Sequence, residues 1–297
     1  MFTGCGTALV TPFRQDQSLD EQVLRKLIRR QIDAGINFLV PCGTTGESPT
    51  LEHAEHLRIV EITVEESRGK VPVVGGSGGY NTKEVISLIK ELERLGVNGI
   101  LSVTPYYNKP TQEGLYQHYK AIAESTPLPI VVYSVQGRTG VNVEPATVAR
   151  LAEIKNIAGI KEASGNLGQM ARILSLVPES FNVLSGDDTL TLPLIGLGGG
   201  GLISVVSNQI PGEMTRLVKS AISGDFPTAQ LLQRKYQELM DINFIESNPI
   251  PVKYGMSLMG LLEPVWRLPL TPPQQASKEK ILAALGRVGL LAEIAHA

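Results

Sequence analysis

A lysine directly follows an apolar run near the middle of the chain. Lys161 comes after residues 157–160 and before small and polar residues, so it lies where a buried strand ends and a loop begins. The ammonium group of a lysine has a pKa of ~10.4 in water, and removal from water disfavours the charged form. The neutral amine attacks carbonyl carbons to give a Schiff base. Lys161 is therefore a candidate nucleophile, although a structural lysine whose ammonium reaches solvent would give the same pattern.

Further residues with useful chemistry follow other apolar runs. They are Thr44, Thr45 and Glu47 after the second run, Tyr106, Tyr107 and Asn108 after the fourth, Tyr133 and Arg138 at and after the fifth, Gly186, Asp187 and Asp188 after the seventh, and Ile203 and Ser204 in the eighth. Hydroxyl groups can pass protons and an arginine can hold a carboxylate, so with Lys161 they supply what an aldolase acting on an α-keto acid needs. Each residue also has a structural explanation, such as a turn for the threonines or an oligomer interface for the adjacent tyrosines.

Eight apolar, strand-like runs alternate with amphipathic helical patterns. The runs are residues 5–10, 38–41, 71–74, 99–103, 129–133, 157–160, 181–185 and 201–205. Continuous apolar strands followed by helices indicate a parallel sheet buried on both faces. Eight such units predict an α/β fold of the (β/α)8 TIM-barrel type, in which chemistry belongs at the C-terminal ends of the strands. An open doubly wound sheet is the alternative, but its Gly-x-Gly-x-x-Gly fingerprint is missing after the first run.

Local patterns also predict helix starts and a change of architecture. Ser18 with Glu21 and Asn81 with Glu84 have the spacing of a capping box, and Pro145 suits a first helical turn. The strand pattern stops near residue 225, and residues 229–240, 250–262 and 277–291 look helical. We therefore expect a (β/α)8 barrel catalytic domain over residues 1–224 and a C-terminal helical domain over residues 225–297.

Composition excludes several classes of partner. The 297 residues are 42% hydrophobic, and 27 Lys and Arg balance 29 Asp and Glu, so no basic surface for nucleic acid is expected. No apolar stretch approaches the ~20 residues of a membrane span, and the N-terminus shows no targeting signal. These observations predict a cytoplasmic protein with neither membrane nor nucleic acid as partner. Cys5 and Cys42 lie in apolar surroundings and are expected to be small buried side chains.

A metal-dependent aldolase is a competing hypothesis. His53 and His56 have an i, i+3 spacing that could hold a metal on one face of a helix. A zinc site needs a third protein ligand, and the other histidines, His118 and His296, are remote in sequence, so we predict no metal. The glycines at 198–201 precede the eighth strand, which is the wrong end for a phosphate-binding loop.

Several of these motifs together resemble the dihydrodipicolinate synthase family, within the pyruvate-dependent Schiff-base aldolases that include N-acetylneuraminate lyase. The motifs are Thr-Thr-Gly-Glu at 44–47, Thr-Pro-Tyr-Tyr-Asn at 104–108, Tyr133 with Gly-Arg-Thr-Gly at 137–140, and Gly-Ile-Lys-Glu-Ala at 159–163. The resemblance runs from about residue 3 to residue 272. It implies that Lys161 forms a Schiff base with pyruvate without any cofactor. The resulting enamine would attack L-aspartate 4-semialdehyde, and the cyclised product, 4-hydroxy-tetrahydrodipicolinate, would enter lysine and diaminopimelate biosynthesis.

The resemblance also implies roles for individual residues. The proton relay would be formed by Tyr133, Thr44 and Tyr107, with Tyr107 reaching in from a neighbouring subunit of a homotetramer built from two tight dimers. Thr45 and the backbone around Gly186 and Ile203 would line the pyruvate site, and Arg138 would hold the carboxylate of the semialdehyde. In relatives inhibited by lysine, the positions that bind the inhibitor at the dimer interface match Ser48, Leu51, His53, His56, Tyr80, Glu84 and Tyr106.

Two departures from the family pattern leave questions open. The usual Tyr-Asn-Val-Pro is Tyr-Ser-Val-Gln at 133–136, and loss of the proline removes a fixed φ angle from the loop that carries Arg138. Tyr80 replaces an asparagine, and its ring could weaken or block lysine, so feedback inhibition stays open. A sister aldolase, such as N-acetylneuraminate lyase, a keto-deoxy-sugar-acid aldolase or a hydratase-aldolase, would share the pyruvate chemistry. A ligand-binding relative without activity would be free to lose Lys161, Tyr133, Thr44 and Tyr107.

Overall fold

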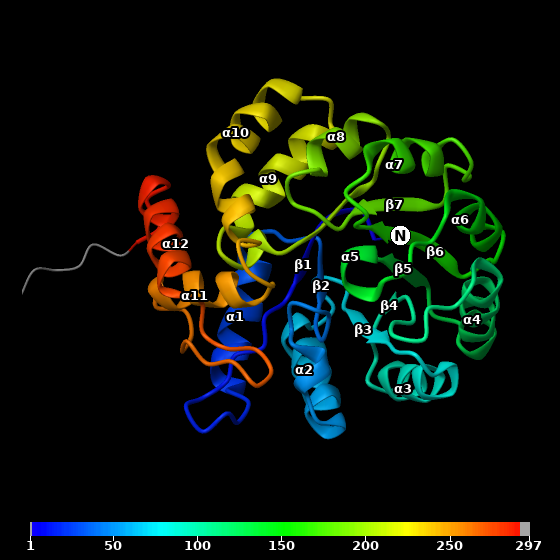
Figure 1. Ribbon diagram of the computed structural model, residues 1–297, viewed down its shortest axis with the longest axis horizontal. Helices are drawn as coiled ribbons and strands as arrows, with labels where there is room; N and C mark the ends of the chain where they lie inside the picture. Colours follow the sequence, from blue (N-terminus) through cyan, green and yellow to red (C-terminus); the bar gives the residue numbers. More distant parts are fainter. Residues whose placement is uncertain (1, 292–297) are drawn as a thin grey trace, which may run out of the picture.

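A barrel of eight parallel strands forms the centre of the molecule (Figure 1). The structure, a computed structural model, describes residues 2–291. The strands follow one another in the order β2-β1-β8-β7-β6-β5-β4-β3. A parallel bridge between Leu39 and Val73, with a hydrogen bond from the Leu39 N–H to the Pro72 carbonyl, joins the two ends of the sheet. The prediction of a (β/α)8 barrel is confirmed.

The bounds of the elements show how strands and helices alternate. The strands are β1 Gly4–Ala8, β2 Phe38–Val40, β3 Val74–Gly78, β4 Gly99–Val103, β5 Ile130–Ser134, β6 Ile157–Glu162, β7 Asn182–Ser185 and β8 Gly201–Ser204. The helices around them are α1 Glu21–Asp33, α2 His53–Ser67, α3 Thr82–Arg94, α4 Gln112–Ser125, α5 Gln136–Thr139, α6 Pro145–Ala152, α7 Leu167–Leu174, α8 Thr191–Gly196 and α9 Pro211–Ile222. Short 3-10 helices lie at Ser48–Thr50 (η1) and Val206–Asn208 (η2).

The third strand does not lie where its apolar residues suggest. We predicted it at 71–74, but β3 begins at Val74 and continues through glycines and a serine to Gly78. A side chain at Gly76 would overlap the carbonyl oxygen of Cys42. Glycine therefore lets β3 approach the loop after β2, although glycine by itself disfavours strands.

Helix starts were predicted with mixed success. Pro145 opens α6, as predicted, and Asn81 caps α3 by accepting a hydrogen bond from the Lys83 N–H. The predicted capping box with Glu84 is not formed, because the Glu84 carboxylate accepts from the Asn81 side chain and not from its backbone N–H. The prediction of a capping box at Ser18 was wrong, because α1 begins at Glu21 and the carboxylate of Asp20 accepts the hydrogen bond from the Val23 N–H. The hydroxyl of Ser18 donates to Asp16 instead.

Two layers of apolar side chains stabilise the barrel. One fills the space between strands and helices, and it contains the buried Cys5 and Cys42, which are free thiols as predicted. The other fills the barrel interior with residues such as Leu101, Tyr133 and Ile203. Alternation along parallel strands directs these side chains inward. The inner layer therefore includes Tyr133, one of the predicted site residues.

Three further helices, α10 Phe226–Ile242, α11 Ile250–Leu258 and α12 Gln275–Arg287, follow the last barrel helix and lie along one flank (Figure 1). Helix α10 packs against α9 and α12, and its buried side chains belong to the same apolar layer as those of the barrel helices. The proposed division at residues 224 and 225 stays a prediction. His296 lies outside the described residues.

Between residues 2 and 291, no helix combines the length and the apolar composition needed to cross a membrane. The predicted cytoplasmic location stays a prediction.

Candidate active site

Lys161 lies near the C-terminal end of β6 with its side chain against Tyr133. The register of β5 and β6 pairs Tyr133 with Lys161, and the lysine Nζ lies 4.2 Å from the centre of the tyrosine ring. Lys161 is 5% exposed. The strand continues through Glu162, two residues beyond the predicted end. The candidate nucleophile is therefore a strand residue, held by hydrogen bonds on both sides of its backbone.

A cavity of about 440 Å³ at this end of the barrel joins most of the predicted site residues. Its wall contains Lys161, Tyr133, Thr44, Thr45, Arg138 and Gly186. These residues come from the ends of β2, β5, β6 and β7, which parallel strands bring to one face. Ile203 lies beneath, in the barrel interior, and is not part of the cavity wall.

Gly186 allows close packing behind the lysine. Its N–H donates to the carbonyl of Glu162 at 2.7 Å. A Cβ at this position would lie 2.6 Å from the Cβ of Ala163 and 3.1 Å from the Cε of Lys161. Only glycine therefore fits here without moving either neighbour.

Arg138 lies on the helical turn α5 and borders the same cavity. The N–H groups of Arg138 and Thr139 donate to the carbonyl of Val135, and Gly140 ends the turn with a φ of +71°. Ser134, where the family has asparagine, accepts a hydrogen bond from the Val143 N–H. The residues after Tyr133 thus form an ordered turn without the proline.

Tyr107 does not reach this cavity within its own chain. Its side chain is 90% exposed, and its φ of +70° lies in the left-handed region, which is uncommon for a bulky residue. The backbone thus presents an aromatic ring to the outside. Of the four residues predicted to do the chemistry, the single chain brings together Lys161, Tyr133 and Thr44.

With this geometry established, the chain was compared with known proteins. A sequence model of the dihydrodipicolinate synthetase family matches residues 1–287. The chain belongs to this family. It is 50% identical over 289 residues to the 4-hydroxy-tetrahydrodipicolinate synthase of Koribacter versatilis, covering 97% of this chain and 96% of that protein.

Solved structures of the dihydrodipicolinate synthetase family have the same fold. The dihydrodipicolinate synthase of Thermotoga maritima is 48% identical, with a TM-score of 0.96 over 98% of this chain and all of that chain. A pyruvate complex of dihydrodipicolinate synthase from Acinetobacter baumannii is 42% identical, also with a TM-score of 0.96, over 98% of this chain and 100% of that one.

Two polar residues near this site, Asn248 and Lys253, were missed in the sequence. Asn248 borders the cavity, its Nδ2 donates to the Thr45 hydroxyl at 2.9 Å, and its carbonyl accepts a hydrogen bond from Arg138 at 3.0 Å. Lys253 forms a buried ion pair with Glu47. A lysine within the apolar pattern of 250–256 is the one local signal that could have indicated it.

Asp188, which follows the seventh apolar run of the sequence, is fully buried between the loop after β7 and the end of β8. Its carboxylate accepts hydrogen bonds from the Ser204 hydroxyl at 2.6 Å and from the N–H groups of Val205 and Val206. Burial raises the pKa of Asp188 to about 6, although these hydrogen bonds oppose the shift. Asp188 thus links the loop after β7 to the end of β8.

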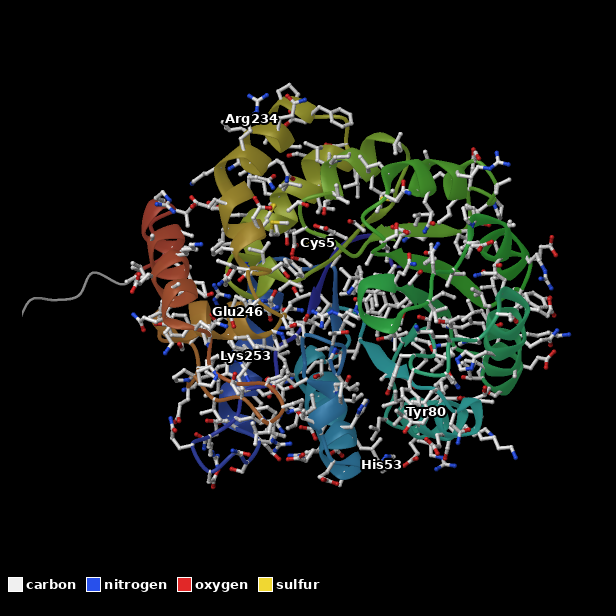
Figure 2. All side chains as sticks on the ribbon, in the orientation of Figure 1. Cys5, His53, Tyr80, Arg234, Glu246 and Lys253 are labelled. Carbon is white, nitrogen blue, oxygen red and sulfur yellow. The ribbon has the colours of Figure 1, made fainter. Side chains whose placement is uncertain are left out.

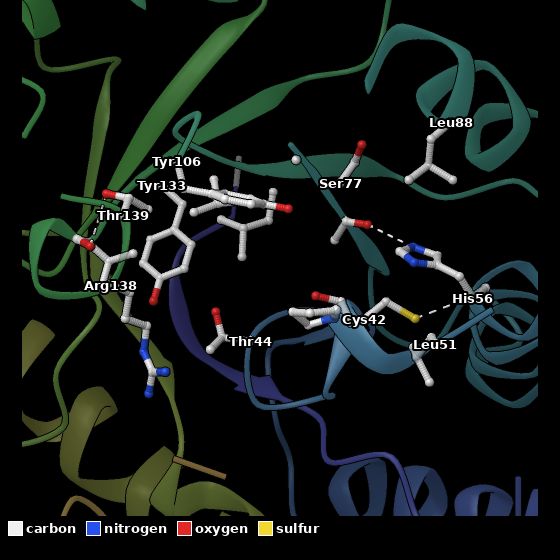
Figure 3. Close-up of a pocket in the computed structure, with 18 of the residues that line it drawn as sticks. Cys42, Thr44, Leu51, His56, Ser77, Leu88, Tyr106, Tyr133, Arg138 and Thr139 are labelled. Carbon is white, nitrogen blue, oxygen red and sulfur yellow. Dashed lines mark hydrogen bonds between the residues drawn. The ribbon is translucent and has the colours of Figure 1, made fainter. Parts of the chain in front are cut away.

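The residues of the predicted inhibitor site line two adjoining cavities. One, of about 480 Å³, reaches from Thr44, Tyr133 and Arg138 to His56 and Leu51 (Figure 3). Its wall also contains Ser48, His53 and Tyr106. The other, of about 370 Å³, is lined by His53, Tyr80, Glu84 and Tyr106. The sequence-predicted set is therefore contiguous in space, with His53 and Tyr106 shared by both cavities.

Both histidines of the hypothetical metal pair use their Nε2 atom in a hydrogen bond within the chain. The ring of His53 bonds to Glu91 at 3.0 Å, and that of His56 bonds to the Gly76 carbonyl at 3.0 Å. Burial lowers the pKa of His56. Within residues 2–291, no group of three or more His, Cys, Asp or Glu has a metal-binding arrangement.

Proposed function

We propose that this chain condenses pyruvate with L-aspartate 4-semialdehyde to give 4-hydroxy-tetrahydrodipicolinate, a step in lysine and diaminopimelate biosynthesis. Membership of the dihydrodipicolinate synthetase family and the activity named for the Koribacter relative support this assignment. The observation that carries it is the buried amine of Lys161, which lies against Tyr133 in a cavity shared with Thr44 and Arg138.

In the first half of the reaction, the Lys161 amine would attack the keto carbon of pyruvate. The carbinolamine loses water to give the Schiff base, and loss of a methyl proton gives the enamine. Each step moves a proton, which the hydroxyls of Tyr133 and Thr44 can accept and return. Thr45 and the backbone at Gly186 and Ile203 would hold the pyruvate carboxylate. No external cofactor takes part in this chemistry.

In the second half, the enamine carbon would attack the aldehyde carbon of the semialdehyde. The guanidinium of Arg138 borders the cavity and can hold the substrate carboxylate with paired hydrogen bonds. The amino group of the condensed semialdehyde then attacks the Schiff-base carbon, which closes the ring and releases the Lys161 amine. Arg138 would thus select an aldehyde that carries a carboxylate.

Tyr107 would complete the proton relay from a second copy of the chain. Its 90% exposure and its left-handed backbone, which present the ring to the outside, support this role. The proposed assembly is a homotetramer made of two tight dimers, in which the tight dimer exchanges Tyr107 between sites.

The two adjoining cavities would form the lysine-inhibitor site. Glu84 offers a carboxylate to a cationic amino acid, but the ring of Tyr80 packs edge-on against Tyr106 with centroids 5.4 Å apart. We expect Tyr80 to weaken lysine binding. Titration of the activity with free lysine checks this point, since stronger inhibition of a Tyr80→Asn variant is expected and equal inhibition would contradict it.

A substrate comparison tests the assignment against sister aldolases. Pyruvate and L-aspartate 4-semialdehyde are supplied together with the reductase that consumes the product, and cleavage of N-acetylneuraminate and of keto-deoxy-sugar acids is measured in parallel. The proposal expects turnover of the semialdehyde to exceed both cleavage reactions. Faster cleavage of a sugar acid would reassign the second substrate.

A further inference from the structure

An ion pair with no exposure to solvent joins the C-terminal helices to the loop after β2. The Nζ of Lys253 on α11 lies 2.5 Å from Oε1 of Glu47, and both side chains are fully buried. The two residues are 206 positions apart in the chain. Lys253 is one of the side chains labelled in Figure 2.

Stability alone explains such a pair poorly. Removing two charges from water costs free energy that their mutual attraction only partly offsets, so apolar side chains of similar size often stabilise a core equally well. Here burial lowers the pKa of Lys253, although the carboxylate of Glu47 acts against the shift. The lysine Nζ also lies 4.5 Å from the ring centre of Phe13, and Arg267 lies 4.1 Å from the same centre. The carboxylate of Glu47 and the ring face of Phe13 favour a charged lysine, whereas burial and the nearby Arg267 disfavour it.

Glu47 belongs to the turn that carries Thr44. The N–H of Glu47 donates to the carbonyl of Thr44 at 3.1 Å, and its φ of +55° places it in the left-handed region. One residue earlier, the Gly46 carbonyl accepts a hydrogen bond from the Thr11 hydroxyl at 2.7 Å. The position of the Glu47 side chain is thus coupled through a short, tight turn to the Thr44 hydroxyl.

The chain just before α11 contacts the other side of the same turn. Asn248, five residues before Lys253, binds the Thr45 hydroxyl through its amide and Arg138 through its carbonyl. Residues 248–253 therefore hold the turn at two points, one at Thr45 and one at Glu47. This short segment also contacts the guanidinium that borders the cavity.

We propose that Lys253 is a positioning residue that acts through Glu47, fixing the Thr44–Thr45 turn so that the Thr44 hydroxyl faces the Schiff base. The inference rests on the proposed function, in which Thr44 moves protons. Lys161 itself is fixed by β5, β6 and β7, which the ion pair does not touch. Loss of the pair should therefore impair turnover while leaving pyruvate capture by Lys161 intact.

A charge-neutral double variant tests this separation. Glu47→Gln combined with Lys253→Met leaves no unpaired charge in the core. Borohydride trapping of pyruvate, kcat, KM and thermal stability are measured for the double variant and the parent. We expect adduct formation within about twofold of the parent and a kcat lowered by about 10- to 100-fold, the range for a misplaced proton-transfer group.

A second ion pair in the C-terminal helices serves as the matched control. Arg287 on α12 pairs with Glu238 on α10 at the surface, far in sequence from the turn. Glu238→Gln with Arg287→Met should leave kcat and adduct formation unchanged.

If the double variant at 47 and 253 does not fold, Lys253→Arg replaces it. The longer, planar guanidinium keeps the positive charge but moves the carboxylate of Glu47. The same loss of kcat with retained adduct is then expected.

Two results would overturn the inference: a kcat within about twofold of the parent in a folded variant, or losses of adduct and turnover in equal proportion. The parent, measured alongside, tests the proposed function separately. A parent that captures pyruvate and turns over the semialdehyde, next to an unaffected variant, contradicts only the role of Lys253. A parent without an adduct contradicts the proposed function, and the inference with it.

Discussion

The hydroxyl groups of Tyr133 and Thr44 lie on the same side of the cavity in Figure 3, next to Arg138. If they move protons, Tyr133→Phe and Thr44→Val should each slow turnover by ~10²- to 10⁴-fold. Phenylalanine differs from tyrosine only by lacking the hydroxyl group, and valine has a methyl group where threonine has its hydroxyl. Steady-state kinetics at saturating substrates check this. Rates within about twofold of the parent would make both residues structural.

A second prediction at this scale concerns stability and pH. His118 is buried beside Thr82, and burial lowers its pKa to about 4. In the unfolded chain a histidine has a pKa of about 6.5, so as pH falls below that value the unfolded state binds a proton that the folded state does not. The stability due to neutral His118 is present above pH ~6.5 and is lost as pH falls towards 4, by up to about 1.4 kcal/mol per pH unit.

The matched variant for this prediction is His118→Gln, which can still bond to Thr82 but does not titrate. Chemical unfolding is measured from pH 7 to pH 4 at one protein concentration. The parent should lose stability more steeply than the variant over this range. Parallel curves would show that His118 is not the group responsible.

Strand ends are the elements that build the site, and Gly186 after β7 is where they pack most closely. Gly186→Ala would force the new Cβ against Ala163 and Lys161, so we expect at least a tenfold loss of pyruvate capture. Gly137→Ala is the control, because Gly137 borders the same cavity but has open space at its Cβ position. Titration of borohydride-trapped adduct against pyruvate concentration measures both. Equal capture by the two variants would refute the close-packing argument.

The sequence could predict those parts of the site that depend on a local residue pattern and on one rule of topology, namely that the C-terminal ends of barrel strands lie together. Lys161, Tyr133, Thr44 and Arg138 each follow an apolar run, and a parallel barrel brings such positions to one end. The third strand was misplaced because Gly76 is required by its contact with the loop after β2, a tertiary constraint that overrides strand propensity.

Contacts between distant parts of the chain could not be predicted in the same way. Lys253 and Asn248 lie on elements with no strand-end signal, and their partners Glu47 and Thr45 are more than 200 positions away. A buried lysine is visible in the sequence only as an exception to an apolar helix, and nothing local identifies the carboxylate that pairs with it. The sequence therefore predicted C-terminal helices without indicating that they contact the site.

At the scale of the whole molecule, the single chain lacks one proposed member of the relay. Tyr107 is 90% exposed in its own chain, so the account requires a second copy to supply it. If so, Lys161→Ala and Tyr107→Ala chains, each inactive or nearly so alone, should regain activity when unfolded and refolded together. Random pairing of equal amounts would make about a quarter of the sites complete, since each mixed dimer has one site with both residues.

Mass in solution and the activity of the mixture check this prediction together. A dimer or tetramer with restored activity is expected. An active monomer, or a mixture no more active than its components, would contradict the supply of Tyr107 from a neighbour.

The central claim is that the Lys161 amine captures pyruvate, and mass spectrometry of the protein after borohydride reduction with pyruvate tests it most directly. The account predicts one three-carbon adduct per chain, located on Lys161 by peptide mapping and absent from Lys161→Ala. An adduct that persists in that variant, or none in the parent, would contradict it.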